Sequence, residues 1–181
     1  MPAGVHQPKN VLITGGCGFI GANFVNFIFN AWPTTKIVNV DKLILNSDIN
    51  YVAEHVRTSP RYELVLADIR NQSVISRILN DNKIDTIIHF AADCTSTRCY
   101  NEPCEAIQNN VLSYIDFLEA VREYGAVSKF IHISTDEVYG DSGLESDEVP
   151  KVETDLLRPG NPYAATKIAA EAYANMYQVA Y

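Results

Sequence analysis

Basic residues are scarce in this sequence, and their scarcity excludes several kinds of partner. The 181 residues include 14 Lys and Arg against 22 Asp and Glu, which gives a net charge of −8. The isoelectric point lies near 4.9. An acidic chain with no basic stripe is a poor match for a nucleic-acid backbone or an anionic membrane surface. We therefore expect neither nucleic acid nor a membrane among its partners.

Long apolar runs are absent as well. No run approaches the roughly 20 residues that a membrane-spanning helix needs. The opening residues MPAGVHQPKN lack the apolar core of a signal peptide, so none is expected. The cysteines are few, and their spacing does not match a zinc site: Cys17, Cys94, Cys99 and Cys104. We interpret them as reduced thiols, predict no metal site and expect a cytoplasmic protein.

What the sequence does contain is a regular alternation of strands and helices. Strands are predicted at Asn10–Thr14, Lys36–Asp41, Tyr62–Ala67, Thr86–Phe90 and Lys129–Ser134. Helices are predicted at Phe19–Ala31, Asp48–Arg57, Gln72–Asn82, Pro103–Tyr124 and Asn161–Tyr181. The acidic stretch Leu144–Asp155 is expected to be a surface loop near the site. Apolar strands that alternate with helices predict an α/β fold with a doubly wound parallel sheet, Rossmann-like.

A glycine-rich turn follows the first predicted strand. Residues 14–21 read TGGCGFIG and fit the pattern G-x-x-G-x-x-G through Gly15, Gly18 and Gly21. They also fit G-x-G-x-x-G, with Gly16 in the first position. Glycines at these positions let the backbone turn tightly and approach a pyrophosphate at the helix N-terminus. The pattern therefore predicts a dinucleotide-binding loop.

Acidic residues at the next two strand ends extend this prediction. Asp41 ends the second strand, 20 residues after Gly21, where a carboxylate can bind the ribose hydroxyls. A carboxylate there favours NAD over NADP, although the adjacent Lys42 weakens the preference. Asp68 and Ile69, after the third strand, either reach the adenine or form a simple turn in which Asp68 caps the next helix.

The fold implied by these signals is incomplete, because no sixth strand follows the fifth. The sequence stops at Tyr181 within a helical pattern. We expect residues 1–181 to form one NAD-binding domain, the N-terminal part of a longer protein, truncated before a smaller substrate domain.

Two adjacent carboxylates close the fifth predicted strand, where residues 133–140 read ISTDEVYG. Ligands bind at this edge of open parallel sheets, although Thr135 and Asp136 could also form a simple turn. Further on, Tyr163 and Lys167 are four residues apart on a helix, so their side chains share a face. An ammonium beside a phenol lowers the phenol pKa from about 10. Tyr163 is thereby predicted to act as a base in alcohol oxidation; the alternative is a surface tyrosine with a solvated lysine.

Four stretches together resemble the extended short-chain dehydrogenase/reductases: TGGCGFIG, HFAA at residues 89–92, STDEVYG and YAATK. STDEVYG in particular resembles the nucleotide-sugar 4,6-dehydratases, which act on dTDP-glucose or UDP-glucose. The resemblance implies a homodimer built through the last two long helices, a 4-keto-6-deoxy sugar product and a place in rhamnose-type synthesis. It also implies further NAD contacts, at Phe19, Ile20, Ala91, Ala92, Tyr163 and Lys167.

The resemblance also implies a role for each reacting side chain. Tyr163 takes the proton of the C4 hydroxyl, and Thr135 hydrogen-bonds the C4 oxygen. Glu137 removes the C5 proton, while Asp136, protonated, donates to the departing C6 hydroxyl. Adjacent carboxylates in one pocket tend to separate their pKa values, which suits one acid and one base.

One segment departs from the family pattern. Residues 93–99 read DCTSTRC, where the dehydratases usually read close to ESHVDRS. Two alternatives therefore stay open: a related epimerase or decarboxylase, and an NAD-binding module without turnover. His89 and His132 lie within apolar strands and are expected to be structural.

Overall fold

The computed structural model of the protein describes residues 7–44, 46–140 and 150–181. The chain divides into two compact units. We call Met1–Ala91 with Asp116–Ile133 the sheet unit, and Ala92–Ile115 with Ser134–Tyr181 the helical unit. Residues 144–149 of the expected acidic loop lie outside the described residues.

The sheet unit is built on five strands, all parallel, in the order β3-β2-β1-β4-β5. The strands are β1 (Asn10–Thr14), β2 (Lys36–Asp41), β3 (Tyr62–Leu66), β4 (Thr86–His89) and β5 (Lys129–His132). Leu12 of β1 lies between Val38 of β2 and Ile87 of β4 in the register. The chain crosses from one side of β1 to the other, so β1 and β4 flank a topological switch point, where ligands bind in such sheets. The predicted doubly wound α/β fold is confirmed.

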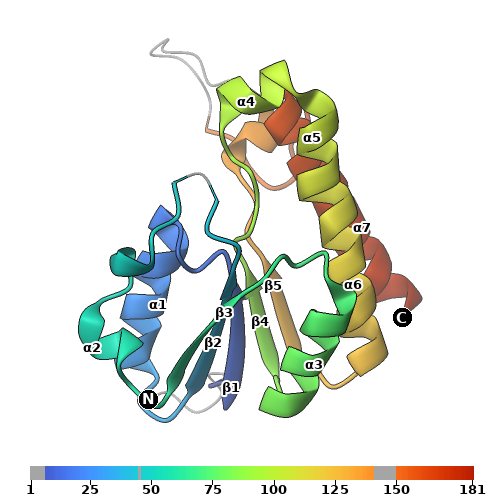
Figure 1. Ribbon diagram of the computed structural model, residues 1–181. Coiled ribbons are helices and arrows are strands. Elements are labelled where there is room, and N and C mark those ends of the chain that lie inside the picture. The colour runs from blue at the N-terminus through green and yellow to red at the C-terminus, as the bar shows by residue number, and fades with distance from the viewer. Residues whose placement is uncertain (1–6, 45, 141–149) are drawn as a thin grey trace. The chain divides into compact units, whose positions relative to one another are not determined.

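Helices cover both faces of this sheet (Figure 1). One face carries α1 (Phe19–Ala31), followed along the chain by η1 (Ile49–Tyr51) and α2 (Glu54–Arg57). The other carries α3 (Gln72–Asn82) and residues 116–124 of α6 (Ser113–Tyr124). Val25 and Ile28 of α1 pack against β1. Because the strands are covered on both sides, they read as continuous apolar runs.

His89 is a structural residue of the sheet unit, as predicted. Its Nδ1 atom lies 2.7 Å from the Thr14 hydroxyl oxygen. Its ring stacks on Phe117 of α6 at 5.4 Å between ring centroids and on His132 of β5 at 5.6 Å. Both histidines thus take part in packing between the sheet and the helix.

The helical unit contains α4 (Ser96–Asn101), α5 (Pro103–Ile107), η2 (Gln108–Leu112), the first residues of α6, η3 (Asp136–Tyr139) and α7 (Pro162–Ala180). Proline occupies the first turn of both α5 and α7, where its missing N–H costs no helical hydrogen bond. The Asn161 side chain caps α7 by accepting from the Ala164 N–H at 2.8 Å. Helix α7 packs against α4, α5, η2 and η3.

Several predicted elements differ from the structure. The helix expected at Asp48–Arg57 is split, because the Asp48 side chain accepts from the Asn50 N–H at 2.8 Å and residues 52 and 53 are extended. The last four residues of the segment 93–99, which departs from the family pattern, form the start of α4, and α4 was not among the predicted helices. The predicted helix Pro103–Tyr124 contains a π-helical turn, η2.

The fifth strand ends two residues before its predicted end, at His132 rather than Ser134. The Thr135 side chain accepts from the Glu137 N–H and starts the 3-10 helix η3. Asp136 and Glu137 therefore lie on a short helix and not on a strand end. No helix among the described residues is long and apolar enough to cross a lipid bilayer.

Candidate active site

The glycines of the predicted loop differ in how much room each leaves for a side chain. Gly15 has a φ of +73°, and a Cβ on it would lie 2.7 Å from the Ala91 nitrogen. A Cβ on Gly21 would collide with the Gly15 carbonyl oxygen. A Cβ on Gly18 meets only that same oxygen, at 3.4 Å, which is ordinary contact. A Cβ on Gly16 would collide with the Asn39 Oδ1 atom. The fold thus needs glycine at three of the four positions, while Gly18 leaves space above the loop.

The open space at Gly18 lies where a pyrophosphate binds in dinucleotide folds. Gly18 is the N-cap of α1, and the first turn of α1 contains no acidic residue. Phe19 and Ile20 in that turn are 77% and 65% exposed. N–H groups in the first turn of a helix lack intrahelical partners and attract anions. The loop therefore fits a dinucleotide pyrophosphate.

Asn39 of β2 holds this loop in place. Its Oδ1 atom accepts from the Gly16 N–H at 3.1 Å, and its Nδ2 donates to the Tyr62 hydroxyl oxygen at 2.9 Å. Asn39 is fully buried. Asn39 was not among the predicted site residues. Its position as a polar residue inside the apolar run KIVNVD could have indicated it.

Asp41, the predicted ribose-binding residue, also braces the loop. Its two carboxylate oxygens accept from the Cys17 N–H at 2.9 Å and from the Leu43 N–H at 2.8 Å. An ionised carboxylate offers about four acceptor sites, so ribose hydroxyls can still bind it. Burial raises the pKa of the Cys17 thiol to about 11, and nearby Asp41 adds to this. Cys17 therefore stays protonated inside the loop.

Lys42 and Asp68 form an ion pair, with Nζ and Oδ2 3.2 Å apart. The Asp68 carboxylate also accepts from the Arg70 N–H at 3.0 Å. Asp68 therefore forms the simple turn that was one of its two predicted roles. However, Asp68 does not cap α3: the cap is Asn71, which accepts from the Val74 N–H at 3.3 Å. Ile69 beside it is buried. Gly15, Gly18, Gly21 and Asp41 thus lie together in the sheet unit, with the Lys42–Asp68 pair on the adjoining strand ends.

The carboxylate pair belongs to the helical unit, where it is tied to α7. Glu137 accepts from the Asn161 Nδ2 at 2.5 Å, and the same Asn161 caps α7. The Thr135 hydroxyl lies 3.4 Å from the Asp136 carboxylate. Asp136 is exposed, whereas Glu137 is half-buried. The two acids therefore have different surroundings, as an acid and a base require.

Tyr163 and Lys167 lie on one face of α7, as their spacing predicted. They are 8% and 4% exposed, and the Lys167 Nζ lies 5.9 Å from the centre of the Tyr163 ring. The alternative of a surface tyrosine with a solvated lysine is wrong. Burial lowers the pKa of Lys167 to about 8, against the opposing effect of Cys94 and Glu171.

The pKa of Tyr163 differs from the expectation. Burial raises it to about 12, and Cys94, Glu137 and Cys99 add to the rise. The predicted lowering by Lys167 is therefore not the dominant effect in the chain alone. Desolvation of the phenolate is the largest cause, so the pKa of Tyr163 moves in the direction opposite to the prediction.

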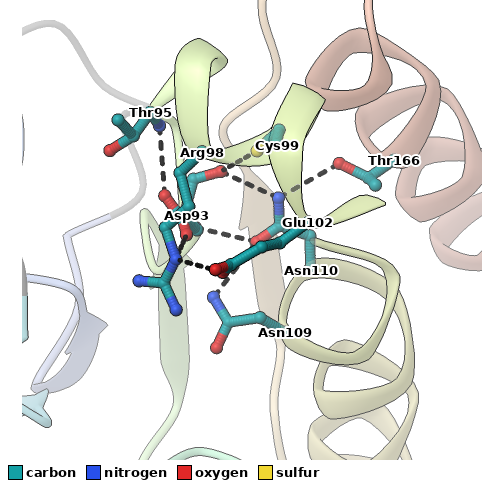
Figure 2. Close-up of polar contacts among 8 residues, drawn as sticks. All are labelled: Asp93, Thr95, Arg98, Cys99, Glu102, Asn109, Asn110 and Thr166. Carbon is teal, nitrogen blue, oxygen red and sulfur yellow. Dashed lines mark hydrogen bonds and ion pairs between the residues drawn. The ribbon is translucent and has the colours of Figure 1, made fainter. Parts of the chain in front are cut away.

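A polar network supports the turn of α7 that bears these residues (Figure 2). Asn110 of η2 accepts from the Asp93 N–H at 2.7 Å and donates to the Asp93 carbonyl oxygen at 2.9 Å. Its Nδ2 also lies 3.1 Å from the Thr166 hydroxyl oxygen, and that hydroxyl donates to the Tyr163 carbonyl oxygen at 2.7 Å. Asn110 was not among the predicted site residues, because its burial in the helix is visible only in the structure.

The segment that departs from the family pattern is well anchored. Arg98 lies between two carboxylates, 3.5 Å from Asp93 and 3.3 Å from Glu102 (Figure 2). The Cys99 thiol lies 3.7 Å from the Asp93 carbonyl oxygen, and Cys99 packs with Ala92 and Tyr163. The substituted residues thus form a defined structure next to Tyr163.

Of the remaining predicted contacts, Ala91 lies against the glycine loop in the sheet unit, and Ala92 packs in the helical unit. All four cysteines are free thiols. Among the described residues, no group of three or more His, Cys, Asp or Glu is arranged to hold a metal ion.

The fold and these residues define a Rossmann-type protein of the extended short-chain dehydrogenase/reductase class. More narrowly, the chain belongs to the GDP-mannose 4,6 dehydratase family, whose sequence profile matches residues 12–181.

Known proteins of this kind resemble the chain over nearly its full length. It is 37% identical, over 97% of its residues, to a trifunctional UDP-glucose 4,6-dehydratase, epimerase and reductase of Arabidopsis thaliana, and spans 26% of that protein. The dTDP-glucose 4,6-dehydratase of Bacillus anthracis, solved in complex with NAD, superposes with a TM-score of 0.83 at 31% identity. That match covers 96% of this chain and 51% of the bacterial one. A UDP-glucose 4-epimerase of Brucella ovis, also with NAD, gives 0.80 at 28% identity and covers 96% of this chain and 49% of the epimerase.

Proposed function

We propose that this chain carries the NAD-binding and catalytic residues of a nucleotide-sugar 4,6-dehydratase, which converts dTDP-glucose or UDP-glucose to the 4-keto-6-deoxy sugar. The observation that carries the proposal is the carboxylate pair Asp136–Glu137, bound through Asn161 to the helix that bears Tyr163 and Lys167. Because the chain spans 26% of the plant relative and 51% of the bacterial one, we also propose that residues 1–181 are the NAD-binding part of a longer protein.

Residues of the sheet unit would hold the dinucleotide. Gly18, Phe19 and Ile20 at the N-terminus of α1 would hold the pyrophosphate, and Asp41 would hold the ribose hydroxyls. Further contacts come from the residues that the family resemblance indicates: Gly15, Gly21, Lys42, Asp68, Ile69, Ala91, Ala92, Tyr163 and Lys167. When bound there, NAD would supply the acceptor for hydride from C4 of the sugar and the donor of the same hydride to C6, so the reaction would have no net redox change.

The chain's own side chains carry the protons. Tyr163 takes the proton of the C4 hydroxyl, assisted by protonated Lys167 and by the positive charge of the bound cofactor, which opposes the raised pKa of the phenol. Thr135 hydrogen-bonds the C4 oxygen. The C4 ketone acidifies the C5 hydrogen, which Glu137 removes, and Asp136 protonates the C6 hydroxyl, which leaves as water. Protonated Glu137 returns its proton to C5 when hydride is added at C6, so the net change is the loss of one water.

The test is mass spectrometry of the products formed by the full-length protein with NAD and either dTDP-glucose or UDP-glucose. The expected product has lost one water. A matched variant, Glu137→Gln, keeps an acceptor for Asn161 but removes the base, so it should stop water loss. Water loss that continues in Glu137→Gln, or no dehydrated product from either sugar, would overturn the proposal.

The epimerase remains a second candidate because a UDP-glucose 4-epimerase shares the fold with a TM-score of 0.80. In that case the sugar would change configuration at C4 without losing water. The altered segment at residues 93–99 motivates a third candidate, an NAD-binding module, whose signature is NAD affinity without any sugar product.

We also propose a homodimer, a cytoplasmic location and a role in rhamnose-type synthesis. The dimer is supported by exposed apolar side chains on α5, η2 and α7 of the helical unit: Ile107, Leu112, Tyr173, Met176 and Val179. Four free cysteines are consistent with a reducing compartment. Light scattering of the full-length protein tests the dimer, and a monomer at micromolar concentration would count against it.

A further inference from the structure

Helix α7 carries a second charged residue whose position is related to the Tyr163–Lys167 pair. Lys167 and Glu171 are the two charged residues in the sequence of α7. They are four positions apart, the spacing at which side chains on a helix are neighbours. Lys167 is buried, and Glu171 is half-buried. A carboxylate thus lies one turn beyond the buried ammonium, on the side opposite to Tyr163.

The same carboxylate holds the segment that precedes η3. The Ser134 hydroxyl donates a short hydrogen bond to the Glu171 carboxylate. Ser134 directly precedes Thr135, the N-cap of η3. At the other side, Asn161 of the α7 cap donates to Glu137 of η3. Residues on both sides of Asp136 are therefore tied to α7.

We propose that Glu171 is a positioning residue of this site: it fixes Ser134, and so the start of η3, on α7, and it places a carboxylate one helical turn from the Lys167 ammonium. This inference rests on the proposed function, because it assigns Glu171 to the same reaction. Glu171 acts through Ser134 and Lys167 and takes no proton itself.

The electrostatic part follows from the surroundings of Lys167. Burial disfavours its charged form and lowers its pKa to about 8, while Cys94 and Glu171 favour the charge. Glu137 of η3 contributes, after burial and Cys94, to the raised pKa of Tyr163. Residues 108–112 of η2 read QNNVL and contain no titratable group. On α4, Arg98 is paired with Asp93 and Glu102, and on α5 Glu105 is exposed.

Two groups thus favour the protonated form of Lys167: the exposed Cys94 thiol and the Glu171 carboxylate. Without Glu171, one of the two groups that oppose the effect of burial is lost, so the pKa of Lys167 should fall further below its ordinary value. Tyr163 would then lose the ammonium that favours its phenolate.

The test compares three substitutions in the full-length protein. Glu171→Gln keeps an oxygen acceptor for Ser134 but removes the charge. Ser134→Ala removes the hydrogen bond but keeps the charge. Glu171→Asp keeps the charge on a shorter side chain.

The direct readout is the titration of Lys167, followed by NMR of protein labelled with 13C at the lysine ε-carbon and assigned by the loss of its signal in Lys167→Met. In Glu171→Gln the midpoint should fall by about half a pH unit, about a threefold change in the protonation ratio. In Ser134→Ala it should stay unchanged, and in Glu171→Asp it should move less than in Glu171→Gln. An unchanged midpoint in Glu171→Gln, or an equal fall in Ser134→Ala, would overturn the charge role.

The second readout is the pH profile of kcat. The alkaline limb should move to lower pH in Glu171→Gln, while Ser134→Ala should lower kcat by a similar factor at every pH. Equal kcat values for Ser134→Ala and the unchanged protein would overturn the role of Glu171 in placing η3. If no nucleotide sugar is turned over, the proposed function fails, but the NMR titration still decides whether Glu171 controls Lys167.

Discussion

The Asn110 side chain binds both backbone polar groups of Asp93: its Oδ1 accepts from the N–H at 2.7 Å and its Nδ2 donates to the carbonyl oxygen at 2.9 Å. Both residues are buried. Asn110 lies in the π-helical turn η2, a feature that is frequent at functional sites. Through Thr166 the same amide is connected to the backbone of Tyr163. The Asn110 amide thus stabilises both the segment before α4 and the turn of α7 that carries Tyr163.

Removing the Asn110 amide should destabilise the protein. Asn110→Leu leaves the Asp93 N–H buried without its partner and leaves the Asp93 carbonyl with the weak Cys99 thiol contact, which costs about 2–4 kcal/mol of the free energy of unfolding. Urea denaturation measures the change. Asn109→Leu is the matched control, because the contact between Asn109 and Asn110 is long, at 3.4 Å, and its loss should cost less than about 1 kcal/mol. Equal losses in the two variants would contradict the assigned role.

Two loop glycines should separate stability from cofactor affinity. Gly21→Ala places a Cβ on the Gly15 carbonyl oxygen, so it should reduce stability by about 2 kcal/mol or more. Gly18→Ala meets ordinary contact, so stability should change by less than about 1 kcal/mol, whereas NAD affinity should fall about tenfold because the methyl group occupies the pyrophosphate space. Urea denaturation and calorimetric NAD titration measure the two effects. NAD affinity that survives Gly18→Ala would place the pyrophosphate elsewhere.

Asn39 should matter for NAD binding although it lies beneath the loop. Asn39→Leu removes the acceptor for the Gly16 N–H, so the loop loses its shape and NAD affinity should fall about fivefold. Tyr62→Phe is the control, since it removes the hydroxyl on the other side of Asn39 and leaves the Gly16 contact intact. Calorimetry should show NAD affinity within about twofold of the original in this control. A similar loss of NAD affinity in both variants would show that the effect comes from core packing and not from the contact between Asn39 and the Gly16 N–H.

Lys167 should reduce stability while it serves the reaction. Its pKa is about 8 when folded, against an ordinary value of 10.5, so between these values the unfolded chain binds more protons and stability rises with pH. Below about pH 8 the full penalty is present. Lys167→Met should therefore unfold less readily at pH 7, by about 1–3 kcal/mol, and lose turnover.

The difference between Lys167→Met and the original protein should shrink as the pH rises through the window from about 8 to 10.5. Urea denaturation at several pH values measures it. Lys129→Met, at an exposed lysine, should stay within about 0.5 kcal/mol at every pH. A pH-independent difference in Lys167→Met would show that its burial carries no protonation penalty.

Much of the fold could be predicted from local patterns. The bounds of β1, α1, β2 and α3 agree with the predicted ranges, because their apolar periodicity and their end signals lie within the segments themselves. The predictions failed where a single side chain redirected the backbone. Asp48 broke an expected helix, and Thr135 started η3 where a strand end was expected.

The candidate site could be predicted as a set of residues but not as an environment. Spacing placed Tyr163 and Lys167 on one face of α7, and the glycine pattern located the loop. It could not show that Tyr163 would have a raised pKa, since that depends on how much water the packed helices exclude. Nor could it find Asn39, Asn110 or Glu171, whose partners are 23, 17 and 37 positions away along the chain.

The sequence by itself determined the order of strands and helices and the position of the glycine loop, because these depend on periodicity and spacing over a few residues. The roles of Asp136, Glu137 and Tyr163 follow from the family resemblance and stay predictions. Only the tertiary structure decided which of these groups are buried, which are held by a partner and which way their pKa values move. Desolvation and hydrogen bonding depend on residues that are distant in the sequence and meet only when the chain is folded.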